Sequence, residues 1–177
     1  MTGTIRLFFA LWPDDSVRAN LAAYATKAHA RAGGRAMRPE TLHITLAFLG
    51  DTSADRLETL LAAAATLAPQ AASLVLDETG YWRHNRIIWA GASIVPQPIA
   101  ALVADLRAAL AEARFTFDSK PFLPHVTLLR KAAPSGPLPA MQPIEWRVTR
   151  FVLVRSTLDA TGSRYEIAGE WSAVGEA

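Results

Sequence analysis

The chain has 177 residues, of which 51% are hydrophobic and 19% charged, a balance typical of a folded globular protein. It contains no cysteine, which excludes disulfides and thiolate metal sites, and no charge-free apolar run long enough to cross a membrane. The formal net charge of +2 is too small to identify a partner. The basic residues are 15 arginines and three lysines. Arginine forks suit an RNA or nucleotide ligand, but a genome that prefers arginine codons explains the bias equally well.

Strands and helices alternate in the first half of the sequence. The opening "MTGTIRLFFALWPDD" has too short an apolar run for a secretory leader, so we expect a strand there and, with no cysteine in the chain, a cytoplasmic protein. In chain order we expect a buried strand over 5–12, a helix from the Asp14–Ser16 cluster to Gly33-Gly34, a strand over 42–49, a turn at Gly50, and a helix over about 54–68 that ends at Pro69.

The second half of the sequence adds hairpins. In chain order we expect strands near 73–80 and 86–92, a helix from Pro96 to about residue 113, a strand over 125–130, a linker rich in proline and glycine, and strands over about 145–157 and 163–172 around the turn "DATG". The regular strand–helix alternation of a parallel sheet is missing. We therefore expect an α+β fold with mostly antiparallel sheets and flanking helices, as a single domain over residues 1–177.

A histidine and a threonine, one residue apart, occur twice in the same pattern, in "HITL" and in "HVTL". Both copies lie in predicted strands, where alternate residues face the same side. His43 and Thr45 therefore project together, and His125 and Thr127 do the same. The two copies are far apart in the chain, so only tertiary folding could bring all four side chains to one cleft.

Two imidazoles and two hydroxyls in one cleft suit phosphoryl chemistry without a metal. The ordinary pKa of an imidazole is about 6.5, so one ring can be neutral and the other charged near neutral pH. The neutral ring can take a proton from water, and the charged ring can give one to a departing oxygen. Threonine hydroxyls can donate hydrogen bonds to the phosphate oxygens. A phosphodiester, and a strained cyclic one above all, is the natural substrate.

The alternative interpretation is structural. A single His-x-Thr-Leu is common by chance, and a lone histidine on a strand is usually a satisfied core or surface residue. Two copies among only four histidines shift the balance toward a functional pair. The remaining histidines, His29 and His84, have no neighbours at metal-ligand spacing, so we expect no metal and no cofactor.

At these residues the sequence resembles the 2H phosphoesterase superfamily, which is named for two His-x-Thr/Ser-x motifs. It is most similar to the bacterial RNA 2′,3′-cyclic phosphodiesterases, also described as RNA 2′-5′ ligases. The similarity includes "RLFFALWP", "LHITLAFLGD", "PFLPHVTLLRK" and "LVRSTLDATGSRYEIAGEW", which together extend over nearly the whole chain. The resemblance implies two intertwined lobes with pseudo-twofold symmetry around a central groove, and metal-independent hydrolysis of RNA 2′,3′-cyclic phosphate ends to 2′-phosphomonoesters.

The resemblance also implies roles for individual residues. By motif position, His43 would be the proton donor to the leaving group and His125 the proton acceptor, with the two labels exchanged in the reverse reaction. Thr45 and Thr127 would hold the phosphate. Arg130 matches the family's arginine near the phosphate. It lies five residues after His125, however, and in a regular strand its side chain would point to the opposite face. Either a bulge turns Arg130 toward the phosphate or its role is structural. Phe48 could stack a base.

Alternatives remain open for the biological role. The main reaction could be reversible 2′-5′ ligation of tRNA halves, or the protein could bind RNA ends without turnover. The expected partners are RNA with a 2′,3′-cyclic phosphate end or small cyclic nucleotides. We expect no membrane partner, and a monomer.

Overall fold

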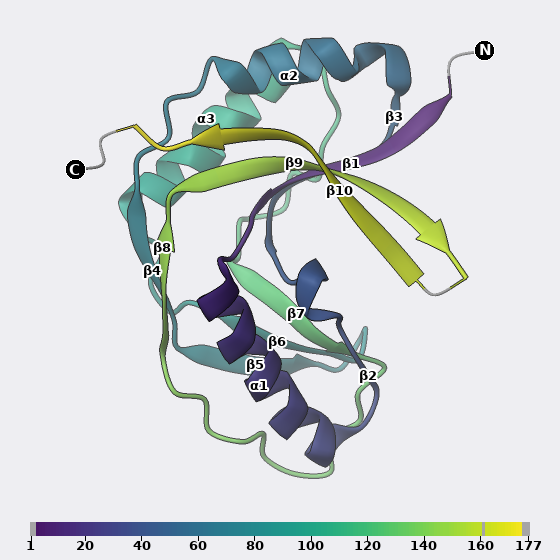
Figure 1. The fold of residues 1–177 in the computed structure, drawn as a ribbon, viewed down its shortest axis with the longest axis vertical. Coiled ribbons are helices and arrows are strands. Elements are labelled where there is room, and N and C mark those ends of the chain that lie inside the picture. The colour runs from purple at the N-terminus through teal and green to yellow at the C-terminus, as the bar shows by residue number, and fades with distance from the viewer. Residues whose placement is uncertain (1–2, 161, 175–177) are drawn as a thin grey trace.

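The computed structural model describes residues 3–160 and 162–174 (Figure 1). Its helices are α1 (Asp15–Ala32), α2 (Leu57–Ala65) and α3 (Gln97–Glu112), with the short 3₁₀ turns η1 (Pro39–Thr41) and η2 (Ala54–Arg56). Its strands are β1 (Thr4–Leu11), β2 (Arg35–Ala36), β3 (Ile44–Ser53), β4 (Ala72–Leu76), β5 (Glu78–Trp82), β6 (Ile87–Gly91), β7 (His125–Arg130), β8 (Ile144–Val148), β9 (Arg150–Asp159) and β10 (Gly162–Ser172).

Most strands form one long sheet in the order β10-β9-β1-β3-β7-β6-β5, with β2 also paired to β7 and with β4 and β8 forming a separate ribbon. Neighbouring strands in both sheets are antiparallel. The prediction of an α+β fold with mostly antiparallel sheets is confirmed. Strands β10 to β3 belong to one lobe and β7 to β5 to the other, and the lobes join where β3 meets β7 (Figure 1).

The helices cross between the lobes, which gives the fold its pseudo-twofold character. Helix α1, which precedes the first His-x-Thr motif, packs behind β7, the strand of the second motif. Helix α3, which precedes the second motif, packs behind β3, which follows His43. Each motif strand is therefore supported from behind by the helix that comes before the other motif.

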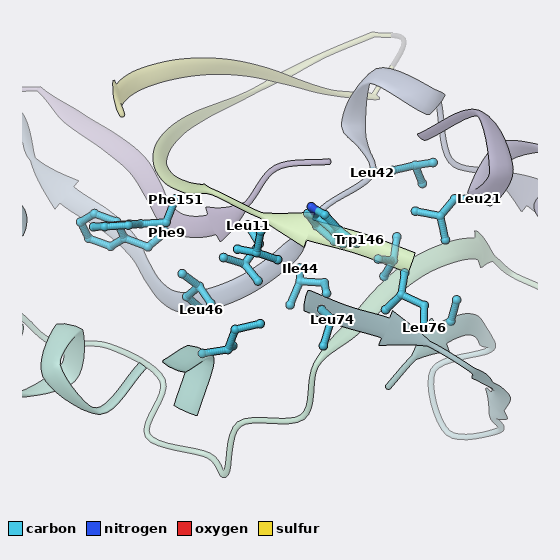
Figure 2. Packing of buried hydrophobic residues seen from close by; sticks show 14 of the residues in the cluster. Phe9, Leu11, Leu21, Leu42, Ile44, Leu46, Leu74, Leu76, Trp146 and Phe151 are labelled. Atoms are coloured by element: carbon cyan, nitrogen blue, oxygen red, sulfur yellow. The ribbon is translucent and has the colours of Figure 1, made fainter. Parts of the chain in front are cut away.

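Buried apolar residues from both lobes form a continuous core (Figure 2). Phe9 and Phe151 lie together, with ring centroids 6.1 Å apart. Trp146 of β8 is almost fully buried, and on the paired strand β4 Leu74 and Leu76 line the same core. Ile44 is 1% exposed, so the face of β3 opposite the His-x-Thr side chains is anchored in this core.

Three expected boundaries were wrong. Two of them are predicted strands that are in fact two strands each, because alternation of apolar and polar residues does not reveal a change of partner strand. The predicted strand 73–80 is two strands, since the chain leaves β4 at Asp77, whose carboxylate accepts hydrogen bonds from the Ser93 amide and hydroxyl. The predicted strand 145–157 is β8 and β9, in different sheets. Gly50 is not a turn: β3 continues through it to Ser53, paired with β1. The helix predicted over 54–68 is shorter, because its first residues form the 3₁₀ turn η2 and α2 ends at Ala65.

Other expectations on boundaries fared better. The first strand, α1, α3 and β7 lie where the sequence places them, within a few residues. Strands β9 and β10 form the expected hairpin, in which Gly162 pairs with Asp159, while residue 161 of the predicted "DATG" turn lies outside the described residues. Among the described residues, no helix combines the length and apolarity needed to cross a membrane.

Candidate active site

The four motif side chains come together because β3 and β7 pair at one point. Ile44 of β3 lies opposite Val126 of β7, and both are buried. Residues before and after this pair point to the other face of the sheet. Continuing the antiparallel register by one residue each way sets His43 opposite Thr127 and Thr45 opposite His125. The two motifs thus form a diagonal array of imidazoles and hydroxyls on one face.

Both histidines are held in the same way by the chain that precedes them. The Nδ1 of His43 lies 2.7 Å from the carbonyl oxygen of Thr41, and the Nδ1 of His125 lies 2.8 Å from that of Leu123. A carbonyl can only accept, so each Nδ1 carries a proton and donates it. In the neutral ring the Nε2 is therefore an acceptor. The Nε2 of His43 lies 3.2 Å from the Thr45 hydroxyl.

Aromatic rings surround His43 on several sides. The Trp12 ring is stacked on it at 5.8 Å between centroids, the Phe8 ring lies tilted at 4.8 Å, and the Tyr165 ring meets it edge-on at 5.4 Å. His125 has the Trp82 ring edge-on at 4.7 Å. These contacts fix the orientation of both rings and remove water from His43 more completely than from His125.

Burial changes the charge state of both imidazoles. The pKa of His43 falls from its ordinary 6.5 to about 4, chiefly because burial penalises the charged ring; the Thr41 hydrogen bond opposes this change, and the charges of His125 and Arg130 add to it. Burial also lowers the pKa of His125, against its hydrogen bond to Leu123. In the protein without a ligand, burial therefore favours the neutral form of both rings near neutral pH.

The lowered pKa of His43 predicts a loss of stability in acid. Below pH 6.5 the imidazole of His43 is protonated in the unfolded chain, whereas in the folded protein it stays neutral down to about pH 4. The free energy of unfolding should therefore fall between pH 6.5 and 4, by up to about 3 kcal/mol. Urea unfolding of the wild type and of His43→Gln across this range measures it. The variant should lose less stability than the wild type, and parallel curves would contradict the assignment.

A bulge follows each motif and turns a further side chain toward the same face. In β3, Ala10 pairs with Thr45 and Phe9 with Ala47, so Leu46 is an extra residue. In β7, Trp89 pairs with Thr127 and Ile88 with Leu129, so Leu128 is extra. Each bulge reverses the alternation that follows it. Phe48 and Arg130, each five residues after its histidine, consequently face the groove.

These side chains line one pocket of about 370 Å³ between the lobes. Its polar walls include the two histidines, the two motif threonines and Arg130, and its aromatic walls include Phe8, Phe48, Trp82 and Tyr165. The bulge in β7 resolves the question that regular strand geometry raised for Arg130, because the residue lies at the pocket and not behind it. Among the described residues, no three His, Cys, Asp or Glu side chains are close enough together to hold a metal ion.

The phenylalanines of β1 and β3 divide between core and pocket. Phe9 is buried in the core, and Phe8 lies beneath His43. Phe48 is 36% exposed, and the guanidinium of Arg6 lies 5.0 Å from the centre of its ring. Phe48 is thus the one of the three with a ring accessible to a ligand.

The model of the LigT-like phosphoesterase family matches residues 11–89 and 92–165 of the chain, which include both motifs. The chain belongs to this family. It is 31% identical to the RNA 2′,3′-cyclic phosphodiesterase of Escherichia coli K12, over 94% of this chain and 96% of that one. It is 34% identical to the enzyme of the same name from Thermus thermophilus, over 97% and 92% of the two chains.

Solved structures agree with this assignment. The crystal structure of E. coli LigT with 3′-AMP matches this LigT-like phosphoesterase with a TM-score of 0.87, at 30% identity and over 97% of this chain and 99% of that one. The apo form of E. coli LigT matches with a TM-score of 0.86 and the same identity.

Several pocket residues of this LigT-like phosphoesterase were not predicted as site residues. Tyr165 lies on β10, opposite Ser156 of β9, and both line the pocket although they are far from the motifs in sequence. Trp82 is the last residue of β5, between the strands predicted near 73–80 and 86–92, and Asn85 lies in the turn after it. Only the quoted similarity around "SRYEIAGEW" pointed toward Tyr165. No local pattern identified Trp82.

Proposed function

We propose that this chain hydrolyses the 2′,3′-cyclic phosphate at RNA 3′ ends to a 2′-phosphomonoester without a metal. The observation that supports this most is that two imidazoles and two hydroxyls, those of His43, Thr45, His125 and Thr127, line one pocket beside the Ile44–Val126 pair. Binding alone needs no proton donor and acceptor. The E. coli and Thermus thermophilus relatives are named RNA 2′,3′-cyclic phosphodiesterases, which supports the substrate and the bond class of this proposal.

The proposed mechanism uses the Nε2 of each ring, the nitrogen that is not bonded to a backbone carbonyl. An anionic phosphate between the rings favours an imidazolium, so binding raises the lowered pKa of His43 and allows the ring to take up a proton. His125, still neutral, accepts a proton from water as the water oxygen attacks phosphorus. The bond from phosphorus to the 3′-oxygen breaks, and His43 protonates that oxygen as it leaves.

The threonines and Arg130 act on the phosphate itself. The hydroxyls of Thr45 and Thr127 donate to the non-bridging oxygens, where negative charge gathers in the transition state. The guanidinium of Arg130 balances the charge of the phosphate from the wall of the pocket. Phe48 offers its exposed ring to the terminal base, which a ring can stack on without sequence preference.

The test is to incubate the purified protein with a short RNA that ends in a 2′,3′-cyclic phosphate, in the presence of a chelator, and to identify the product. We expect the 2′-phosphomonoester, distinguished from the 3′-isomer by chromatography against both standards. A 3′-phosphate product would overturn the assignment of the leaving group. Binding of RNA ends with no hydrolysis between pH 5 and 9 would identify an end-binding protein instead.

A second reaction is favoured by the equivalent tethering of the two histidines. Because both Nδ1 atoms donate to a carbonyl two residues earlier, either Nε2 can give or take the proton. With a 5′-hydroxyl RNA in place of water, the same groups act in the same direction: His125 accepts the proton of the 5′-hydroxyl as its oxygen attacks phosphorus, the bond from phosphorus to the 3′-oxygen breaks, and the ends are joined by a 2′-5′ bond. With the two roles exchanged, the same groups cleave that bond again. Formation of a 2′-5′ linkage between a 5′-hydroxyl RNA and a 2′,3′-cyclic phosphate RNA tests this, and its absence at high RNA concentration would exclude it.

A further inference from the structure

We propose that a second anion site beside the catalytic pocket binds the phosphate that links the terminal nucleotide to the rest of the RNA. The site is a hollow of about 270 Å³, here called the arginine hollow, whose lining residues include Arg35, Arg38 and Arg130. The proposal rests on the proposed function and specifies its substrate as an RNA chain in preference to a mononucleotide.

The arginine hollow is a direct neighbour of the catalytic pocket. Four segments form it: β2, the turn η1, the end of β7 and the start of β10. The two cavities share the lining residues Met37, Thr41, Arg130, Ser163 and Tyr165. Since Arg130 lines both, its side chain can contribute to binding an anion in either cavity.

The charge of the arginine hollow suits a phosphodiester. Among the residues that the structure describes, none with a carboxylate lines it. Arg38 has an ion pair, at 3.5 Å with Glu40, and it also donates to the carbonyl oxygen of Ser163 at 2.6 Å. Arg35 and Arg130 have no carboxylate partner among the residues that the structure describes. Two guanidinium groups are thus available to an incoming anion.

A nearby larger hollow is less suitable. It has a volume of about 500 Å³ and also borders Thr41 and Tyr165, but Glu40 and Glu166 line it together with its arginines. Carboxylates beside a phosphate repel it and weaken the site. The excess of arginine over carboxylate therefore favours a path of the RNA chain from the catalytic pocket into the arginine hollow.

The covalent structure of RNA matches this pair of cavities. Successive phosphates are separated by one sugar, so a second phosphate site must lie directly beside the first. The hairpin end also leaves room for Arg35: a Cβ on Gly162 would lie 3.2 Å from the Nη1 of Arg35, and the φ of +124° at Gly162 is one that other residues rarely adopt. The guanidinium is thus held close to the backbone of β10 without a side chain in its way.

The experiment compares adenosine 2′,3′-cyclic phosphate with the dinucleotide ApA that ends in a 2′,3′-cyclic phosphate. The wild type should have a kcat/KM about tenfold higher for the dinucleotide, the scale of one charge-assisted hydrogen bond. Arg35→Gln should reduce this preference to about twofold or less, and Arg35→Glu should reverse it, while the kcat/KM for the mononucleotide stays within about twofold in both variants. Raising the salt concentration from 50 to 200 mM should lower the kcat/KM for the dinucleotide about 2.5-fold more than the kcat/KM for the mononucleotide.

Arg31→Gln is the matched control, because Arg31 lies in the last turn of α1 and lines neither the catalytic pocket nor the arginine hollow. It should retain the wild-type preference. If the wild type hydrolyses neither substrate, the proposed function itself fails. The second anion site is overturned if the kcat/KM for the dinucleotide does not exceed that for the mononucleotide. It is also overturned if Arg35→Gln lowers the kcat/KM for both substrates by the same factor. In either case the proposed function stands.

Discussion

Replacing His43 or His125 by alanine is expected to lower the kcat for cyclic phosphate hydrolysis by about 10²- to 10⁴-fold in each single variant. Each ring has its Nδ1 committed to a backbone carbonyl, so only its Nε2 can transfer a proton, and no other histidine lines the pocket. Because the two rings act in one step, the double variant should be little slower than the worse single variant. The measurement is single-turnover hydrolysis of a nucleoside 2′,3′-cyclic phosphate.

The control for this experiment is His29→Ala, which removes a histidine at the end of α1, outside the pocket. It should hydrolyse at close to the wild-type rate. A near-wild-type rate in either His43→Ala or His125→Ala would rule out the two-histidine mechanism. Unfolding curves at pH 7 for each variant separate a lost proton transfer from a lost fold, since the core behind the motifs contains Ile44 and Val126 and neither histidine.

Replacing Arg130 by glutamine should lower kcat/KM by about 10²- to 10³-fold, the effect of removing one group that stabilises the charge of a transition state. The bulge at Leu128 places Arg130 on the pocket wall, close enough for its charge to lower the pKa of His43. Arg130→Lys should recover only part of the loss, because an ammonium keeps the charge but not the fork that matches two phosphate oxygens.

The pH dependence gives a second readout of Arg130. Its positive charge disfavours the imidazolium of His43, so Arg130→Gln should raise the pKa of His43 from its low value. An NMR titration of the free protein measures this shift. The appropriate reference is Arg83→Gln, which removes an arginine of the β5–β6 turn that does not line the pocket. Unchanged kcat/KM together with an unchanged titration would show that Arg130 does not reach the phosphate.

The sequence predicts the motif side chains of the site because their arrangement follows from alternation along a strand. His43 with Thr45, and His125 with Thr127, lie together as expected, and the family similarity anticipated the groove between two lobes. What remained ambiguous was the side chain five residues after each histidine. The inserted Leu46 and Leu128 are apolar and buried like their neighbours, so nothing local distinguishes them from regular strand residues.

Tertiary arrangement decides the rest of the site. The low pKa of His43 depends on rings from β1, from the residue that follows β1 and from β10, three places that no motif connects. The split of the predicted strand 73–80 depends on which sheet each part joins. Neither effect has a local sequence pattern, since a buried apolar residue looks the same whichever partner covers it.

The order of the long sheet has a consequence for how the molecule could be divided. Strands β10 and β9 come from the C-terminal half, β1 and β3 from the N-terminal half, β7 again from the C-terminal half, and β6 and β5 from the N-terminal half. A cut between β6 and α3 would leave two fragments, each of which lacks strands and helices that pack against its own. Such pieces should assemble only as a complementing pair, with neither able to build half a catalytic centre by itself.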